Sequence, residues 1–270
     1  MNLFTVDVED WFQAGVMQPY VSRNPSLVNN KRLHETMDAL LKLLSALNQR
    51  ATFFCLGNLL PEYSELIQRI VREGHEIASH GMTHRNLHTL TARELEWELK
   101  ESKRMLEDCT GTVVMGFRAP NFSITDLAID TLERVGYSYD SSVFPLTGRK
   151  NYGKLSEKPM GTRPYFFDNG LQEFPLSVYS WRGLSVPIAG GAYLRHFPFS
   201  TMMSMIQTSS ELGYYHCYIH PWEVDKNHPS VSGMGMVDRL RHYRNIDVMP
   251  QRLNQLFQAI LFSSIREVLE

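Results

Sequence analysis

The stretch LFTVDVED, residues 3–10, begins as an apolar, β-prone run and ends in three acidic side chains. Residues two apart in a strand lie on the same face, so Asp7 and Glu9 should point to one side. Asp10 can join them if the chain bends after the strand. A solvated acidic turn is the alternative interpretation of these three residues. A buried strand that ends in carboxylates is typical of a parallel α/β fold with functional side chains at its strand ends.

Beyond residue 10, helical and strand patterns alternate along the chain. Apolar residues at helical spacing predict helices over 33–47, 63–71, 95–106, 128–135, 202–206 and 253–260. Apolar or β-prone runs between them predict strands over 51–56, 75–79, 113–117, 137–139, 214–220 and 261–263. Thr91 and Glu94 form a capping-box pair that opens one of these helices, and Gly111 ends it.

This alternation implies a parallel sheet, and about seven such units predict a closed or nearly closed (β/α) barrel. An open, doubly wound sheet is the alternative, although no G-x-G-x-x-G follows the first strand. Residues 145–192 are rich in glycine, proline and aromatic side chains and interrupt the alternation. We expect residues 1–270 to form one domain in which 145–192 is an insertion or a cleft-forming region.

The composition narrows the classes of protein to which the chain can belong. Its 270 residues are 43% hydrophobic and 21% charged, which is typical of a globular protein. The net charge is −2 without a basic block, so we expect no nucleic-acid partner. The three cysteines form no CxxC pair, which favours a reducing compartment over a disulfide framework. We predict a cytoplasmic protein without a membrane span, because neither a signal peptide nor a long apolar run is present.

Two histidines follow the third predicted strand. The run SHGMTH, residues 79–84, carries His80 and His84. Two imidazoles four residues apart in a single helical turn can bind one metal ion, although ten histidines make a chance pair of this kind unremarkable. Together with a carboxylate from the end of the first strand, they would form a catalytic metal site with an open position for water.

Two further polar clusters follow strands. The run FRAPNF, residues 117–122, places Arg118 where its guanidinium can orient a carboxylate, unless it is a surface arginine at a turn. The run YIHPWE, residues 218–223, carries His220 and Trp222. His220 is either a site residue or a satisfied core histidine, and Trp222 offers a sugar-stacking surface or a pocket wall.

In this order, the clusters resemble the motifs of the polysaccharide deacetylase family, also called the NodB-homology or carbohydrate esterase family 4 proteins. The run VDVED looks like the acidic first motif, and SHGMTH is similar to the H-[ST]-x-x-[HN] motif. Residues 118–120 resemble the Arg-x-Pro motif, and Ile219-His220 resembles a late motif that ends in a catalytic histidine. The resemblance covers Leu3 to about Glu223 and implies a distorted (β/α) barrel.

Other runs narrow the resemblance. VDVEDWF, YDSSVFP, EFPLS, GGAYLR and IHPWE are similar to deacetylases of exosortase-linked exopolysaccharide clusters, which implies a role in making a bacterial surface glycan. The usual first motif has two adjacent aspartates, whereas a valine follows Asp7 here. The metal carboxylate therefore maps to Glu9 by strand parity, with Asp10 as the second choice. The tryptophan that often follows the fourth-motif aspartate is missing after Asp140, so the sugar-facing wall is expected to differ.

The resemblance implies a metal-dependent amide hydrolase. A divalent metal ion, most simply zinc, would be held by Glu9, His80 and His84, would activate a water molecule and would polarise the acetamide oxygen. Asp7 would be the general base, and Arg118 would hold it in place.

The remaining roles concern the leaving group and the sugar. His220 would protonate the leaving amine, and Asp140 would orient His220 or raise its pKa. The expected substrate contacts are Pro120, Tyr193 and Trp222.

The implied substrate is a carbohydrate that carries N-acetyl groups. One alternative is a related amidohydrolase that acts on a small cyclic amide or a formyl group, in some cases without metal. The other is a glycan-binding pseudoenzyme, which would have no need of all four of His80, His84, Arg118 and His220.

Overall fold

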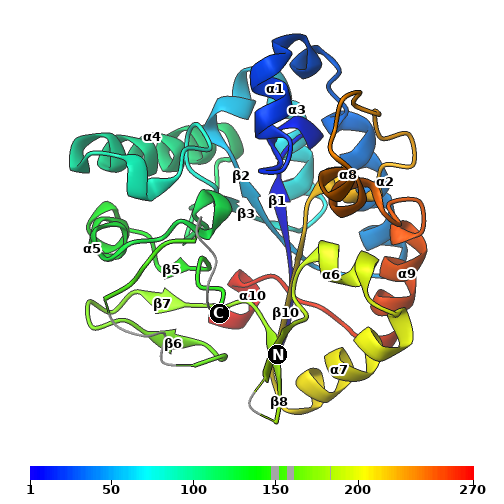
Figure 1. The fold of residues 1–270 in the computed structure, drawn as a ribbon. Helices are drawn as coiled ribbons and strands as arrows, with labels where there is room; N and C mark the ends of the chain where they lie inside the picture. Colours follow the sequence, from blue (N-terminus) through cyan, green and yellow to red (C-terminus); the bar gives the residue numbers. More distant parts are fainter. Residues whose placement is uncertain (147–151, 157–160, 183) are drawn as a thin grey trace.

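The computed structural model describes residues 1–146, 152–156, 161–182 and 184–270, so the segment 145–192 lies partly outside the described residues. A curled sheet occupies the middle of the molecule, and most of the longer helices lie around it (Figure 1). None of the described helices combines the length and the apolar character that a bilayer span requires.

The first half of the chain follows the predicted alternation closely. Its strands and long helices are β1 (Asn2–Val8), α2 (Leu33–Ala46), β2 (Thr52–Cys55), α3 (Leu60–Arg72), β3 (Glu76–Ser79), α4 (Ala92–Thr110), β4 (Gly116–Phe117), α5 (Asp126–Val135) and β5 (Tyr139–Asp140). The short helix α1 (Gln18–Arg23) follows β1 and was not predicted.

The second half is less regular. It contains β6 (Tyr165–Phe166), β7 (Gln172–Glu173), β8 (Val178–Trp181), β9 (Leu184–Pro187), α6 (Gly191–His196), α7 (Phe199–Glu211), β10 (Tyr215–Ile219), α8 (Met236–Tyr243), α9 (Met249–Ala259) and α10 (Arg266–Leu269). The helices α6, α8 and α10 were not predicted. The strand expected at 261–263 is reduced to a single bridge between Leu3 and Ser263.

The strand order confirms the predicted α/β class and the distorted barrel. The order is β10-β1-β2-β3-β4-β5-β7-β6, in which only the β6–β7 pair is antiparallel. Seven strands therefore run in the same direction. The described strands β10 and β6 are the two ends of this order, so the sheet is a curled, open barrel rather than a closed one.

Alternation along β1 explains how the sequence positions the site. Phe4, Val6 and Val8 pack in the large core that β1 shares with the surrounding helices. Leu3 packs in a different cluster with interior residues of neighbouring strands, such as Phe54. Because successive side chains of a strand point to opposite faces, Asp7 and Glu9 lie on the side of Leu3, and they do so at the carboxyl end of the strand.

Capping residues fix the ends of two outer helices. Thr91 accepts the backbone N–H of Glu94 and completes the predicted capping box of α4, and Gly111 ends that helix with a left-handed φ of 66°. Thr125 caps α5 by accepting the backbone N–H of Ala128. The signals at Thr91 and Gly111 were sufficient to predict both ends of α4 from the sequence.

Candidate active site

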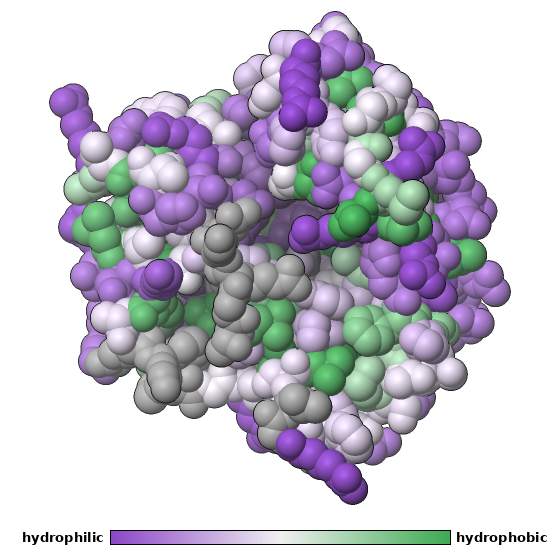
Figure 2. Space-filling view, in the orientation of Figure 1, coloured by the Kyte–Doolittle hydropathy of each residue, from purple (hydrophilic) through white to green (hydrophobic). Residues whose placement is uncertain are grey.

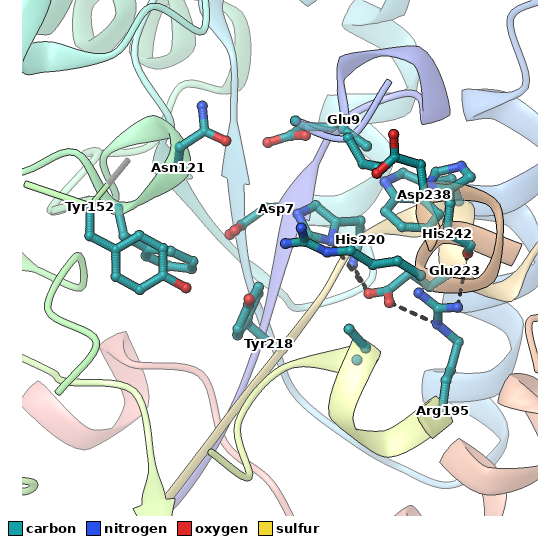
Figure 3. Close-up of a pocket in the computed structure, with 18 of the residues that line it drawn as sticks. Asp7, Glu9, Asn121, Tyr152, Arg195, Tyr218, His220, Glu223, Asp238 and His242 are labelled. Carbon is teal, nitrogen blue, oxygen red and sulfur yellow. Dashed lines mark hydrogen bonds and ion pairs between the residues drawn. The ribbon is translucent and has the colours of Figure 1, made fainter. Parts of the chain in front are cut away.

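A cleft of about 510 Å³ opens where the parallel strands end. Figure 2 shows the face seen in Figure 1 hollowed near its centre, with hydrophilic side chains in and around the hollow. Asp7, Glu9, Tyr218 and His220 point into this space in Figure 3. The cleft therefore brings together side chains from β1 and β10, which are far apart in the sequence and adjacent in the sheet.

Glu9, His80 and His84 form a group that could hold a metal ion. The three ligand atoms lie within 4.8 Å of one another. Glu9 Oε1 is 3.0 Å from His80 Nε2 and 2.7 Å from His84 Nε2. Burial raises the pKa of Glu9, but the charge of His84 and the hydrogen bonds of both imidazoles lower it more, so the pKa lies well below its usual value. A buried carboxylate at this position requires positive charge beside it.

The hydrogen bonding of His80 fits metal ligation. Its Nδ1–H donates to the backbone carbonyl of Arg118 at 2.8 Å, so the neutral ring carries its lone pair on Nε2, which faces Glu9. A lone pair beside a buried carboxylate oxygen is favourable only when a proton or a cation lies between them. Two imidazoles and one carboxylate are also the donor set of one class of catalytic zinc site, in which a further position stays open.

The segment that carries the two histidines is a loop, which corrects the expectation of a helical turn. Gly81 and His84 have left-handed backbone conformations, with φ values of 83° and 61°. This conformation is uncommon for a residue other than glycine, and it aims the His84 ring back toward Glu9. The loop is held from α4, because the buried Glu98 accepts hydrogen bonds from the backbone N–H groups of Met82 and Thr83 at 2.8 and 2.9 Å. Sequence analysis missed this anchoring residue.

Asp10, the second choice for the metal carboxylate, has a different set of contacts. Its Oδ1 accepts the backbone N–H of Trp11 at 2.8 Å, and its Oδ2 accepts the backbone N–H of Arg32 at 2.9 Å. Both oxygens are therefore occupied at the start of a short helix. The geometry favours Glu9, as strand parity does.

Asp7 lies at the centre of a buried hydrogen-bond network. Arg118 is completely buried and donates to Asp7 Oδ1 at 2.7 Å and to Thr5 Oγ1 at 2.8 Å. The other donors of Arg118 contact Ser141 and His216, and burial together with this guanidinium lowers the pKa of His216 well below its usual value. A neutral His216 can accept a hydrogen bond from Arg118, so the network fixes the guanidinium and, through it, the Asp7 carboxylate.

His220 is held by a carboxylate that was not predicted. Glu223 Oε2 accepts the backbone N–H of His220 at 3.1 Å and lies 3.4 Å from its Nδ1. Burial lowers the pKa of His220, but the hydrogen bond with Glu223 and the charges of Glu9, Glu223 and Asp7 raise it to about 9. Glu223 is itself fixed by the buried Arg195, whose Nε is 3.1 Å from Glu223 Oε1 (Figure 3).

Asp140 does not occupy the predicted position beside His220. Its carboxylate accepts the hydroxyl of Ser142 at 2.6 Å and the backbone N–H of Ser142 at 3.1 Å, and among the described residues it makes no contact with His220. Burial raises its pKa, and burial together with Asp140 raises the pKa of the neighbouring Glu173 well above its usual value. Glu173 is therefore the member of this buried pair that holds a proton more readily.

The three predicted substrate contacts lie in different places. Pro120 is buried at the start of a short helix. Trp222 lines the cleft, but its ring stacks on both His220 and His242, which suits a wall rather than a sugar platform. Tyr193 lines a smaller cavity next to the cleft.

Comparison with known proteins divides the chain into two parts. Residues 26–139 match the family described as polysaccharide deacetylase, and residues 141–270 match a domain of unknown function, DUF3473. Strands of the second part pair with β5 and β1, so one sheet contains both matched parts. The first match includes His80, His84 and Arg118, whereas His220 lies in the second.

A curated relative and two solved structures illustrate the likeness. A peptidoglycan deacetylase of Helicobacter pylori is 34% identical over 104 residues, which are 38% of this chain and 36% of that protein, so the chain spans about a third of that relative's length. The crystal structure of a putative polysaccharide deacetylase from Mycobacterium smegmatis has a TM-score of 0.62 at 17% identity, over 99% of this chain and 87% of that one. A structure described as a carbohydrate esterase family 4 pseudoenzyme, from Bacillus anthracis, has a TM-score of 0.51 at 17% identity, over 100% of this chain and 65% of that one.

Proposed function

We propose that the chain is a metal-dependent hydrolase that removes N-acetyl groups from an amino sugar or glycan, a proposal that the match of residues 26–139 to the polysaccharide deacetylase family supports. One observation carries this proposal. The group Glu9, His80 and His84 lies beside a cleft into which a fixed carboxylate, Asp7, and a fixed imidazole, His220, both point (Figure 3).

The fold alone would not support an activity, because one of the structures with this fold is described as a pseudoenzyme. The proposal therefore rests on the residues themselves. A glycan-binding protein would not need a buried arginine to fix Asp7 or a buried carboxylate to fix His220.

In the proposed reaction, Glu9, His80 and His84 hold a divalent cation, for which zinc suits the donor set. When bound, the cation supplies Lewis acidity that activates water and polarises the acetamide carbonyl. Asp7, held by Arg118, accepts a proton from the attacking water as its oxygen adds to the carbonyl carbon. His220 donates a proton to the nitrogen as the C–N bond breaks, which yields acetate and a free amine.

The substrate belongs to the same proposal. The motifs that resemble those of the polysaccharide deacetylase family support an N-acetylated amino sugar as the substrate. The runs similar to those of exosortase-linked deacetylases support a role in building a bacterial exopolysaccharide. Whether the acceptor is a polymer, a lipid-linked sugar or a nucleotide sugar is decided by which of them loses acetate.

The test is an acetate-release assay with a panel of N-acetylated substrates of these three kinds. Protein freed of metal with a chelator should be inactive, and zinc should restore turnover together with stoichiometric appearance of free amine. The Asp7→Asn variant should keep the metal and lose turnover, whereas an exposed control, His88→Ala, should behave as the wild type. Zinc-loaded protein that releases acetate from no member of the panel would contradict the proposal.

A further inference from the structure

A second cavity opens beside the cleft. It has a volume of about 390 Å³ and shares Tyr152, Ala192, Tyr218 and Arg241 with the cleft, so the two spaces are adjacent. We call it the side cavity. A substrate with its N-acetyl group at Asp7 and His220 would therefore extend into the side cavity with a neighbouring unit.

The two spaces differ in charge. The described residues that line the cleft include the carboxylates of Asp7, Glu9, Glu223 and Asp238. Those that line the side cavity include two arginines, Arg241 and Arg244, and no carboxylate. The cleft also carries Arg195 and Arg241, so its described carboxylates outnumber its arginines, whereas the described lining of the side cavity carries arginines alone and therefore favours an anion.

The two arginines are free to bind a ligand. Both are exposed near the end of α8, and among the described residues neither guanidinium makes a hydrogen bond or an ion pair. Arg239 on the same helix differs, because its guanidinium lies 5.8 Å from the centroid of the Tyr243 ring and donates a hydrogen bond to Ser230.

Neighbouring groups report the same positive potential. Burial lowers the pKa of Arg252, and the charge of Arg244 lowers it further. Burial also lowers the pKa of His196, with further contributions from Arg195 and Arg244. An anion bound at Arg244 would relieve this repulsion.

Aromatic side chains form the rest of the wall. Tyr193, Phe197 and Tyr218 line the side cavity, and Phe197 is 36% exposed. Aromatic faces suit the apolar face of a pyranose ring, and arginine suits a carboxylate or phosphate through paired hydrogen bonds. The two features together describe a sugar that carries a negative charge.

We propose that the side cavity binds an anionic unit next to the N-acetyl sugar, with Arg241 and Arg244 as the groups that bind its carboxylate or phosphate. The inference rests on the proposed function, because it names the class of substrate for that same site. The anion has two possible sources. One is a uronic acid beside the N-acetyl sugar in a glycan, and the other is the phosphate that links the sugar to a carrier.

The experiment compares three substrates. N-acetylchitotetraose is neutral, a hyaluronan tetrasaccharide carries uronates, and UDP-N-acetylglucosamine carries a diphosphate. Free amine is measured for the wild type, for Arg241→Gln, for Arg244→Gln and for the double variant. Arg239→Gln is the matched control, since it removes the same charge from the same helix outside the side cavity.

We expect the wild type to prefer one anionic substrate over chitotetraose. On that substrate, kcat/KM of each single variant should fall about tenfold because KM rises. On chitotetraose, kcat/KM of each single variant should stay within about twofold of the wild-type value. Added salt should reduce the preference of the wild type for the anionic substrate over chitotetraose, and it should leave the substrate preference of the double variant unchanged. Loss on the hyaluronan fragment identifies a uronate, and loss on the nucleotide sugar identifies a phosphate.

Two results would overturn the inference. One is a double variant that retains the wild-type preference, and the other is a double variant that loses equally on all three substrates. If the wild type deacetylates chitotetraose, either result refutes the binding of an anion in the side cavity and leaves the proposed deacetylase activity standing. If no substrate loses acetate, calorimetry with the two anionic probes on metal-free protein still decides the matter. Binding that the double variant weakens at least tenfold supports the side cavity, and no binding by the wild type refutes it.

Discussion

Replacing Glu223 with glutamine should move the pH dependence of the proposed reaction. Glutamine keeps the size of the side chain and an oxygen that can accept the hydrogen bond of His220, but it removes the negative charge. With that charge present, the pKa of His220 is raised to about 9, against the effect of burial. Without it, the effect of burial opposes only the remaining charges of Glu9 and Asp7, and the pKa should fall toward the ordinary value of about 6.5.

The size of the effect follows from the protonated fraction of His220. At pH 8 this fraction should fall from about 0.9 to about 0.03, which predicts a loss of about thirtyfold in kcat/KM. At pH 6 both proteins are mostly protonated, so their rates should differ little. The variant should also unfold more easily, by about 3–5 kcal/mol, because the buried Arg195 loses its counterion.

The assay is kcat/KM against pH on the best acetamide substrate, with the metal content and the melting temperature measured in parallel. Asp238→Asn is the matched control, since Asp238 lines the same cleft and contacts Tyr20 rather than His220. Activated aryl acetates need little protonation of their leaving group and should be affected much less. If kcat/KM of the Glu223→Gln variant fell at the same high pH as that of the wild type, this account of His220 would be refuted. An equal shift of the pH dependence in Asp238→Asn would refute it too.

Three further predictions concern other parts of the site. Glu9→Gln should lose metal affinity, whereas Asp10→Ala should keep it and lose about 0.5–2 kcal/mol of stability because a helix cap is removed. Elemental analysis and denaturant unfolding measure the two effects, and the reverse pattern of metal content would assign the ligand to Asp10. Gly191→Ala should reduce turnover at unchanged metal content, because its Cβ would lie 2.3 Å from Glu223 Oε2, and wild-type turnover would show that this carboxylate can move freely. Glu173 has a raised pKa, so the folded state keeps a proton that the unfolded state loses, and stability should decrease as the pH rises above about 4.5 at up to about 1.4 kcal/mol per pH unit. Glu173→Gln should weaken that decrease in unfolding experiments between pH 4 and 8, and an identical decrease in both proteins would show that Glu173 is ionised in the fold.

Periodicity was enough to predict the sheet and the helices that cover it. Strand parity at Asp7 and Glu9 and the caps at Thr91 and Gly111 are local signals, and the structure has each of them where the sequence indicates. The loop at residues 80–84 was mistaken for a helical turn, because its shape depends on the distant Glu98 and on a left-handed His84. Neither feature is visible in a spacing of four residues.

The contacts of the predicted acids could not be derived from their order. Asp140 and Glu223 both follow strands, but only the fold shows that Asp140 faces Glu173 while Glu223 reaches His220. The signal for Glu223 was present in the run YIHPWE, where it stands three residues after the histidine at the start of a short helix. Arg195 was beyond sequence reasoning, because its partner is 28 residues away.

The central claim is that Glu9, His80 and His84 hold one catalytic cation, and a zinc titration of metal-free protein tests it most directly. The acetate-release rate on the best substrate is followed against the molar ratio of zinc to protein. We expect a linear rise that ends at about one ion per chain for the wild type and for His88→Ala, and no rise for His84→Ala. Metal-free protein that releases acetate at the full rate would contradict the claim, and so would a His84→Ala variant with the wild-type titration.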